Sequence, residues 1–148
     1  MKISILLPYK ENFSPEYPGA VSIYVKSTTE CSKFKNNIFV YGSTKFKKKL
    51  SKNYINLPFS KELFQSSSKI YVKNFLKKEN VNKSDIIEIH NRPSYVNEVF
   101  LNTKSKLVLY FHNDPLEMNG SKSANERIDL LNKVEKIIFN SLWSKKRF

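Results

Sequence analysis

The sequence has one cysteine, Cys31, among its 148 residues. A single cysteine excludes an internal disulfide and favours a reducing compartment. Cys31 falls in a segment that we expect to be helical, so we interpret it as a small buried or half-buried hydrophobe. The chain also lacks the cysteine and histidine clusters that bind zinc, and no metal site is expected.

Long apolar runs are missing as well. The opening run, 3–7, stops at Pro8 and is too short for the core of a secretory signal. No run approaches the length that crosses a bilayer. With 40% hydrophobic and 14% aromatic residues, the composition is nevertheless globular. We expect one domain, 1–148, in the cytoplasm, with peripheral membrane contact at most.

Arginine is scarce although the net charge is +13; it occurs only at Arg92, Arg127 and Arg147. Base reading and bidentate phosphate binding favour arginine over lysine. The lysines are spread along the whole chain, with one dense run at 47–49. We therefore interpret the charge first as solvated surface and second as contact with an anionic membrane face. Nucleic-acid binding ranks last, and no nucleic-acid partner is expected.

Motifs of several common enzyme classes are absent. There is no glycine triplet for a dinucleotide and no P-loop, which argues against nicotinamide dehydrogenases and P-loop kinases. A nucleophile-elbow serine is also missing, which argues against Ser-His-Asp hydrolases.

What the sequence does contain is a regular alternation of short apolar runs and helical segments. We expect strands at 2–7, 37–41, 54–57, 85–89, 106–111 and 136–139. Helices are expected at 19–32, 66–78, 93–102, 124–133 and 142–148, and the basic connector 44–52 would form one or two helical turns at most. This alternation, without a hairpin signal, predicts an α/β fold: a Rossmann-like, doubly wound parallel sheet with helices on both faces.

Helical spacing also predicts which side chains share a face of each helix. The expected sets are Val21, Tyr24, Val25 and Thr28; Tyr71, Val72, Phe75 and Leu76; Val96, Val99 and Phe100, pointing inward; and Ala124, Ile128 and Leu131.

The two histidines each follow a predicted strand. Five apolar residues, 107–111, indicate a strand buried on both faces, and polar residues follow it directly. The strand at 85–89 ends in the same way. The polar residues at these two ends are His90, Asn91, Arg92, His112, Asn113 and Asp114. Ligands of open α/β sheets bind at the carboxyl ends of the strands, so we expect both groups to share one edge with the loop 8–19.

These strand ends offer two interpretations. A neutral imidazole can bind a sugar hydroxyl or a phosphate oxygen, and Asn or Asp can orient hydroxyls. Alternatively, the polar residues are structural caps of the strands. Gly19 likewise is either a plain turn residue or a position where the backbone approaches a phosphate at a helix N-terminus.

A resemblance adds to these observations. The segments KISILLP, Pro18-Gly19-Ala20, DIIEIHNRP, LVLYFHND and VEKIIFNSLWSKKRF follow one another along essentially the whole chain. In this order and spacing they resemble the N-terminal half of a family 4 (group 1) glycosyltransferase with the GT-B fold. The family usually has two adjacent glycines in its first loop, where this chain has Gly19 followed by Ala20.

The resemblance implies a cytoplasmic, retaining glycosyltransferase that uses a nucleotide-sugar as substrate and needs no metal or cofactor. The acceptor would be a cell-envelope glycan or a lipid-linked saccharide. This half would bind the acceptor, and the C-terminal donor-binding domain would be absent from the chain, leaving it inactive alone. The implied roles are His112 as the catalytic residue facing the sugar; Gly19 and Ala20 for the donor phosphate; and His90, Asn91, Arg92, Asn113, Asp114 and Lys10 for the acceptor.

Two other classes stay open. A stand-alone flavodoxin-like or receiver-like domain would need an acidic phosphoacceptor after the first or third strand, where the chain has Pro8-Tyr9 and Leu57-Pro58. A lysine-rich module would bind anionic membranes or nucleic acid in a salt-dependent manner.

Overall fold

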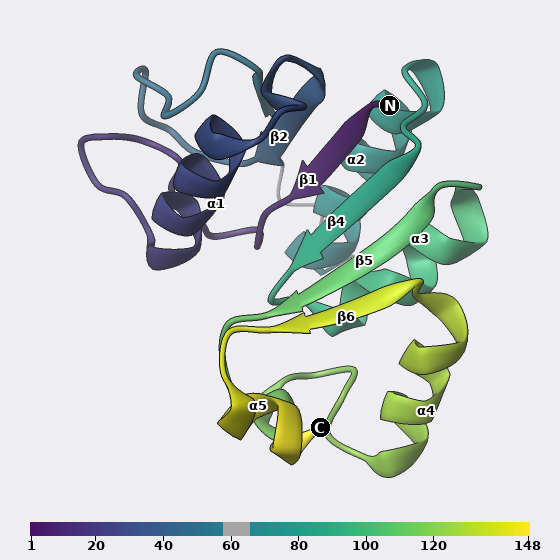
Figure 1. Cartoon of the computed structure of the whole chain (residues 1–148). Coiled ribbons are helices and arrows are strands. Elements are labelled where there is room, and N and C mark those ends of the chain that lie inside the picture. Colours follow the sequence, from purple (N-terminus) through teal and green to yellow (C-terminus); the bar gives the residue numbers. More distant parts are fainter. Residues whose placement is uncertain (58–65) are drawn as a thin grey trace.

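The computed structural model describes residues 1–57 and 66–148, which form one α/β unit built on a parallel sheet (Figure 1). Within these residues the sheet has six strands in the order β3-β2-β1-β4-β5-β6. The strands are β1 (Ile3–Leu6), β2 (Ile38–Gly42), β3 (Tyr54–Asn56), β4 (Ile86–His90), β5 (Lys106–Phe111) and β6 (Lys136–Phe139). All six were expected from the sequence. Pro58, the expected end of β3, lies outside the described residues.

The strand order identifies the topology as Rossmann-like. Order 3-2-1-4-5-6 is that of the dinucleotide-binding doubly wound sheet, whereas flavodoxin-like domains have the order 2-1-3-4-5. Every neighbouring pair runs parallel, including the β1–β4 pair, where Ile3 faces Ile86. The chain leaves β1 toward one side of the sheet and leaves β4 toward the other, so the topological switch point lies between these two strands.

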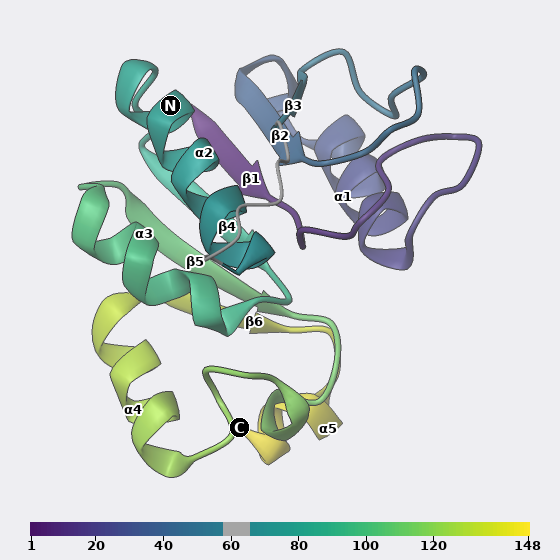
Figure 2. The same cartoon turned by 180° about the vertical axis from the view of Figure 1, so that it is seen from behind.

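Helices cover both faces of the sheet, but unequally. Helix α1 (Ala20–Cys31) packs on one face, where it buries Val21 and Val25. The opposite face is covered by three helices, as the view from behind shows (Figure 2): α2 (Ser67–Val81), α3 (Val96–Asn102) and α4 (Ala124–Lys133). A short last helix, α5 (Leu142–Arg147), follows β6.

Serine caps begin three of these helices. The side chain of Ser66 accepts a hydrogen bond from the Lys69 N–H, and Ser141 accepts one from the Ser144 N–H. Ser123 and Glu126 form a complete capping box at the start of α4. These caps explain why the helices begin close to where the sequence predicted, although α2 extends three residues further than expected.

Several predictions of burial are wrong. Val108 and Tyr110 of β5 are half-buried, so this strand is not buried on both faces. Among the described residues, the one helix on their face is α1, which packs mainly on β1, β2 and β4 and reaches Tyr110 through Tyr24. Phe100, which was expected to point inward, is 43% exposed. The spacing placed Thr28 on one face of α1, and Ile128 and Leu131 on one face of α4; these three side chains are exposed, and α4 buries Leu130. Cys31, the last residue of α1, is exposed rather than buried.

The connector 44–52 contains no helix, contrary to expectation. It crosses back from the end of β2 to the start of β3, and Leu50 packs against the cluster beneath α1. Its main chain joins the β1–α1 loop through the bond from the Leu50 N–H to the Phe13 carbonyl, at 3.4 Å. This contact joins the connector to the β1–α1 loop.

Candidate functional site

The two histidines meet at the carboxyl edge of the sheet, as predicted. His90 is the last residue of β4 and His112 follows β5, its neighbour in the sheet. The Nδ1 atom of His90 lies 3.0 Å from the Nε2 atom of His112, which is a hydrogen-bond distance. His90 is only 1% exposed, whereas His112 is half-buried. His90 is therefore the inner imidazole, and it supports the ring of His112, which reaches the surface.

Two tyrosines enclose this pair. The Tyr110 ring stacks on the His90 ring, with centroids 4.4 Å apart and planes 7° from parallel. Tyr24, from α1, places its ring edge-on to His112 at 5.0 Å. Tyr24, which the helical spacing grouped with Val21 and Val25, is 39% exposed at the rim of the site. Helix α1 thus reaches across to the ends of β4 and β5.

A carboxylate completes the arrangement. Glu88, two residues before His90 on the same face of β4, places Oε2 3.4 Å from the Nε2 atom of His90. Burial, with a further contribution from His90, lowers the pKa of His112 from 6.5 to about 4. Burial and then the Glu88 charge raise the pKa of the Tyr110 hydroxyl above its ordinary range. At neutral pH, His112 and Tyr110 are therefore both uncharged.

Asn91 holds the main chain of the site. It has φ of 55°, a left-handed conformation that asparagine adopts more readily than most residues. Its main-chain N–H donates to the Tyr110 carbonyl at 2.7 Å, and its Oδ1 accepts from the His112 N–H at 3.2 Å. On the other side, Nδ2 of Asn140 donates to the His112 carbonyl at 2.8 Å. Asn91, predicted to bind the acceptor, here joins the ends of β4 and β5.

The other residues predicted to bind the sugar acceptor differ in whether their side chains already have partners within the protein. Arg92 is half-buried and donates from Nη1 to the carbonyl of Asn91 at 2.7 Å. Asn113 is exposed beside His112. Asp114 accepts from the Leu116 N–H and pairs with Arg147 at 2.6 Å, which lowers the pKa of the Asp114 carboxyl. Asp114 therefore joins the β5 end to α5 and has its carboxylate already engaged.

The predicted phosphate position at the start of α1 holds a side chain of the protein. Gly19 is the N-cap of α1, and Ala20 is its exposed first residue. Oε1 of Glu11 accepts from the Ser22 N–H at 2.9 Å, and a Cβ added to Gly19 would overlap this carboxylate. Lys10 is exposed in the turn just before Glu11. An anion thus occupies the helix N-terminus, but it is supplied by the chain itself.

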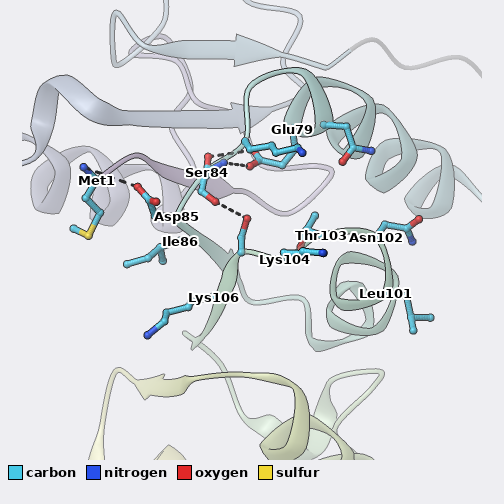
Figure 3. Close-up of a pocket in the computed structure, with 13 residues that line it drawn as sticks. Met1, Glu79, Ser84, Asp85, Ile86, Leu101, Asn102, Thr103, Lys104 and Lys106 are labelled. Atoms are coloured by element: carbon cyan, nitrogen blue, oxygen red, sulfur yellow. Dashed lines mark hydrogen bonds and ion pairs between the residues drawn. The ribbon is translucent and has the colours of Figure 1, made fainter.

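A groove of about 1190 Å³ opens at the opposite, amino edge of the sheet, between the C-terminal ends of α2 and α3. Figure 3 shows Glu79 hydrogen-bonded to Ser84 in its wall. Glu79 is 1% exposed, and Ser4 and Ser84 satisfy its carboxylate. No histidine lines this groove, whereas both histidines of the chain lie at the carboxyl edge. We therefore take the carboxyl edge as the candidate site.

Within residues 1–57 and 66–148, no three His, Cys, Asp or Glu side chains are grouped so as to hold a metal ion. None of the helices described for these residues combines the length and apolar character that crossing a membrane requires. Compared with models of known families and with curated proteins, the sequence gives no match.

Residues that the sequence analysis did not select complete the site: Glu88, Glu11, Tyr24 and Tyr110. Glu88 had one visible signal, a charge within an otherwise apolar strand and two residues before a histidine. Glu11 had none, because its partner Ser22 belongs to another element. The site presents a neutral imidazole, exposed amide and basic groups, and a helix N-terminus that is held by the Glu11 carboxylate.

Proposed function

We propose that this chain is the acceptor-side half of a retaining glycosyltransferase that moves a sugar from a nucleotide-sugar to a cell-envelope glycan or a lipid-linked saccharide. The observation that carries the proposal is the meeting of His90, His112 and Tyr24 of α1 at the carboxyl edge of a Rossmann-like sheet, beside its switch point. Ligands of such sheets bind at this place.

In this proposal His112 contacts the transferred sugar, and the start of α1, at Gly19 and Ala20, faces the donor phosphate. His90 and Asn91 hold His112 in place, while Arg92, Asn113 and Lys10 are available to acceptor groups. The nucleotide would be bound by a second domain, which lies outside residues 1–148. In this proposal the leaving diphosphate displaces Glu11 from the N–H groups that begin α1, and these groups together with the basic side chains balance its charge without a metal or other cofactor.

Contact with an anionic membrane is the second part of the proposal. In α5, Leu142 is 77% exposed and Trp143 is 59% exposed, and Lys145 and Lys146 follow on the same helix. Exposed apolar side chains beside lysines favour the interface of a bilayer that contains anionic lipid. Such a location would bring a lipid-linked acceptor to the carboxyl edge.

The test uses the protein encoded by the complete gene that contains this chain. It is incubated with uridine, guanosine and thymidine diphosphate sugars and a membrane-lipid extract, and release of the nucleoside diphosphate is measured. We expect release with at least one donor, and sedimentation with vesicles that contain phosphatidylglycerol. A protein that consumes none of these donors would contradict the glycosyltransferase proposal. A protein that sediments equally with neutral vesicles would contradict the membrane proposal.

A further inference from the structure

Three side chains from two neighbouring strands form a chain of hydrogen bonds at the carboxyl edge. Glu88 and His90 are two residues apart on β4 and therefore share a face, and His112 follows β5 on the same face. Oε2 of Glu88 is 3.4 Å from Nε2 of His90, and Nδ1 of His90 is 3.0 Å from Nε2 of His112. His90 is almost fully buried, and the Glu88 side chain is 20% exposed. Hydrogen bonds therefore run from a carboxylate to the outermost imidazole.

We propose that Glu88 is a positioning residue that fixes the proton positions of both imidazoles, so that His112 presents an unprotonated Nδ1 to a substrate hydroxyl. This inference rests on the proposed function only for the identity of the substrate. The proton positions of the two imidazoles concern the resting protein and can be tested without any activity.

The proton positions follow from the inventory of donors and acceptors. An ionised carboxylate can only accept, so the hydrogen in the Glu88–His90 bond belongs to Nε2 of His90. The proposal takes His90 as singly protonated, so that Nδ1 of His90 has no hydrogen and must accept. The donor in the second bond is therefore Nε2–H of His112, which leaves Nδ1 of His112 with a free lone pair. Within the described parts of the chain, no side chain or main-chain group is hydrogen-bonded to this atom.

The surroundings favour the neutral state of His112. Its pKa is lowered to about 4 by burial and by His90, so the ring carries one N–H at neutral pH. The groups that face the pair are Tyr24 from α1, Tyr110 from β5 and Glu88 from β4. Tyr110 stacks on His90 and stays protonated, since burial raises the pKa of its hydroxyl. None of these groups supplies a positive charge, and the carboxylate is the one anion of the set.

The consequence is selectivity for one kind of ligand group. A bare Nδ1 accepts a hydrogen bond from a hydroxyl, but it has no hydrogen to donate to a phosphate oxygen. His112 would therefore bind a sugar hydroxyl, and the phosphate would have to bind elsewhere, at donors such as the N–H groups that begin α1.

The test is nitrogen-15 NMR of the 148-residue chain with labelled histidine, and the presence of only two histidines makes assignment direct. Protonated and bare ring nitrogens have well-separated shifts, and a scalar coupling through the hydrogen bond identifies the donor. At pH 7.5 we expect both rings to carry the hydrogen on Nε2, with His112 donating to His90. A hydrogen on Nδ1 of His112 in the wild-type chain, or a doubly protonated His90, would overturn the proposal.

Variants extend the test. Glu88→Gln retains an oxygen acceptor and should keep both tautomers. Glu88→Lys supplies only a donor, so His90 must accept at Nε2, and both rings should move their hydrogen to Nδ1. Glu98→Lys makes the same charge change on the exposed side of α3 and should leave both tautomers unchanged. An unchanged His112 tautomer in folded Glu88→Lys would refute the role of Glu88, and the wild-type spectrum decides the matter if that variant does not fold.

Activity is a separate readout in the protein from the complete gene. There Glu88→Lys should reduce turnover by about 10²-fold, the scale expected for losing one oriented hydrogen bond in a transition state. Normal turnover with a reversed His112 tautomer would contradict the hydroxyl-acceptor role. The expected spectra combined with absence of glycosyl transfer in the wild-type protein would instead overturn the proposed function and leave the proton positions established.

Discussion

Replacing Glu11 by alanine tests whether the start of α1 is an anion site. In the wild-type chain the Glu11 carboxylate accepts from the Ser22 N–H at 2.9 Å and lies against Gly19, the N-cap. Helix α1 has no acidic residue in its first turn and no side-chain cap of its own. The carboxylate therefore supplies both the missing acceptor and the negative charge that the helix dipole favours.

The size of the effect follows from these two roles. Loss of an N-cap acceptor typically costs about 1 kcal/mol of folding free energy. In a protein of this size, that corresponds to a decrease in Tm of about 3 °C. An anion that binds the vacated N–H groups stabilises the folded state by about 1.4 kcal/mol at ten times its Kd. Inorganic phosphate should therefore restore the lost stability of Glu11→Ala, whereas in the wild-type chain it must compete with Glu11.

The assay is thermal unfolding, followed by circular dichroism, at increasing phosphate concentration and constant ionic strength held with chloride. The matched control is Glu30→Ala, which removes the same charge at the other end of α1, where Glu30 forms an exposed ion pair with Lys26 at 3.5 Å. Without phosphate, we expect Glu11→Ala to have a lower Tm than the wild type or the control. Added phosphate should raise the Tm of Glu11→Ala more than that of the other two proteins. Equal phosphate dependence in all three proteins would refute an anion site at this helix end.

Three further outcomes are expected. In the protein from the complete gene, His112→Ala should lower turnover by about 10²-fold or more with little change in Tm; a lower Tm with normal turnover would instead support a strand cap. Calorimetry on residues 1–148 should detect no micromolar binding of a nucleotide-sugar, because the proposal assigns nucleotide binding to a second domain, and micromolar binding would contradict that assignment. Because the pKa of His112 falls from 6.5 to about 4 on folding, the unfolded chain binds more protons between these values. The free energy of unfolding should thus be highest above pH 6.5 and decrease toward pH 4. It should depend less on pH in His112→Gln.

The sheet could be predicted from the sequence because its signals are local. Parallel strands are short apolar runs, and the turn residues and serine caps between them mark the ends of each element. The expectation that the polar residues after β4 and β5 share one edge of the sheet with the loop after β1 is confirmed, because these three strands are neighbours and His90 meets His112. Their meeting required only the general rule that polar side chains after parallel strands share the carboxyl edge.

Burial was harder to predict, because spacing shows which residues share a face but not what covers it. Val108 and Tyr110 belong to an apolar run, yet within the described residues α1 covers this part of the sheet only through Tyr24, whose ring lies 6.2 Å from that of Tyr110. Ile128 and Leu131 share one face of α4, but the sheet lies under Leu130. Side-chain partners such as Glu88 with His90 and Glu11 with Ser22 depend on register and loop path, which no single segment encodes.

The hydrogen bonds around His112 separate its structural role from its chemical one. Its main-chain N–H and carbonyl are bound by Asn91 and Asn140, which tie it to the ends of β4 and β6. Its side chain makes one hydrogen bond, to His90, and is half-buried. The position of the residue is thus fixed by groups that an alanine would retain. A strand cap needs only those main-chain bonds, so a neutral imidazole held in one orientation by a buried histidine and a carboxylate favours the binding of a ligand.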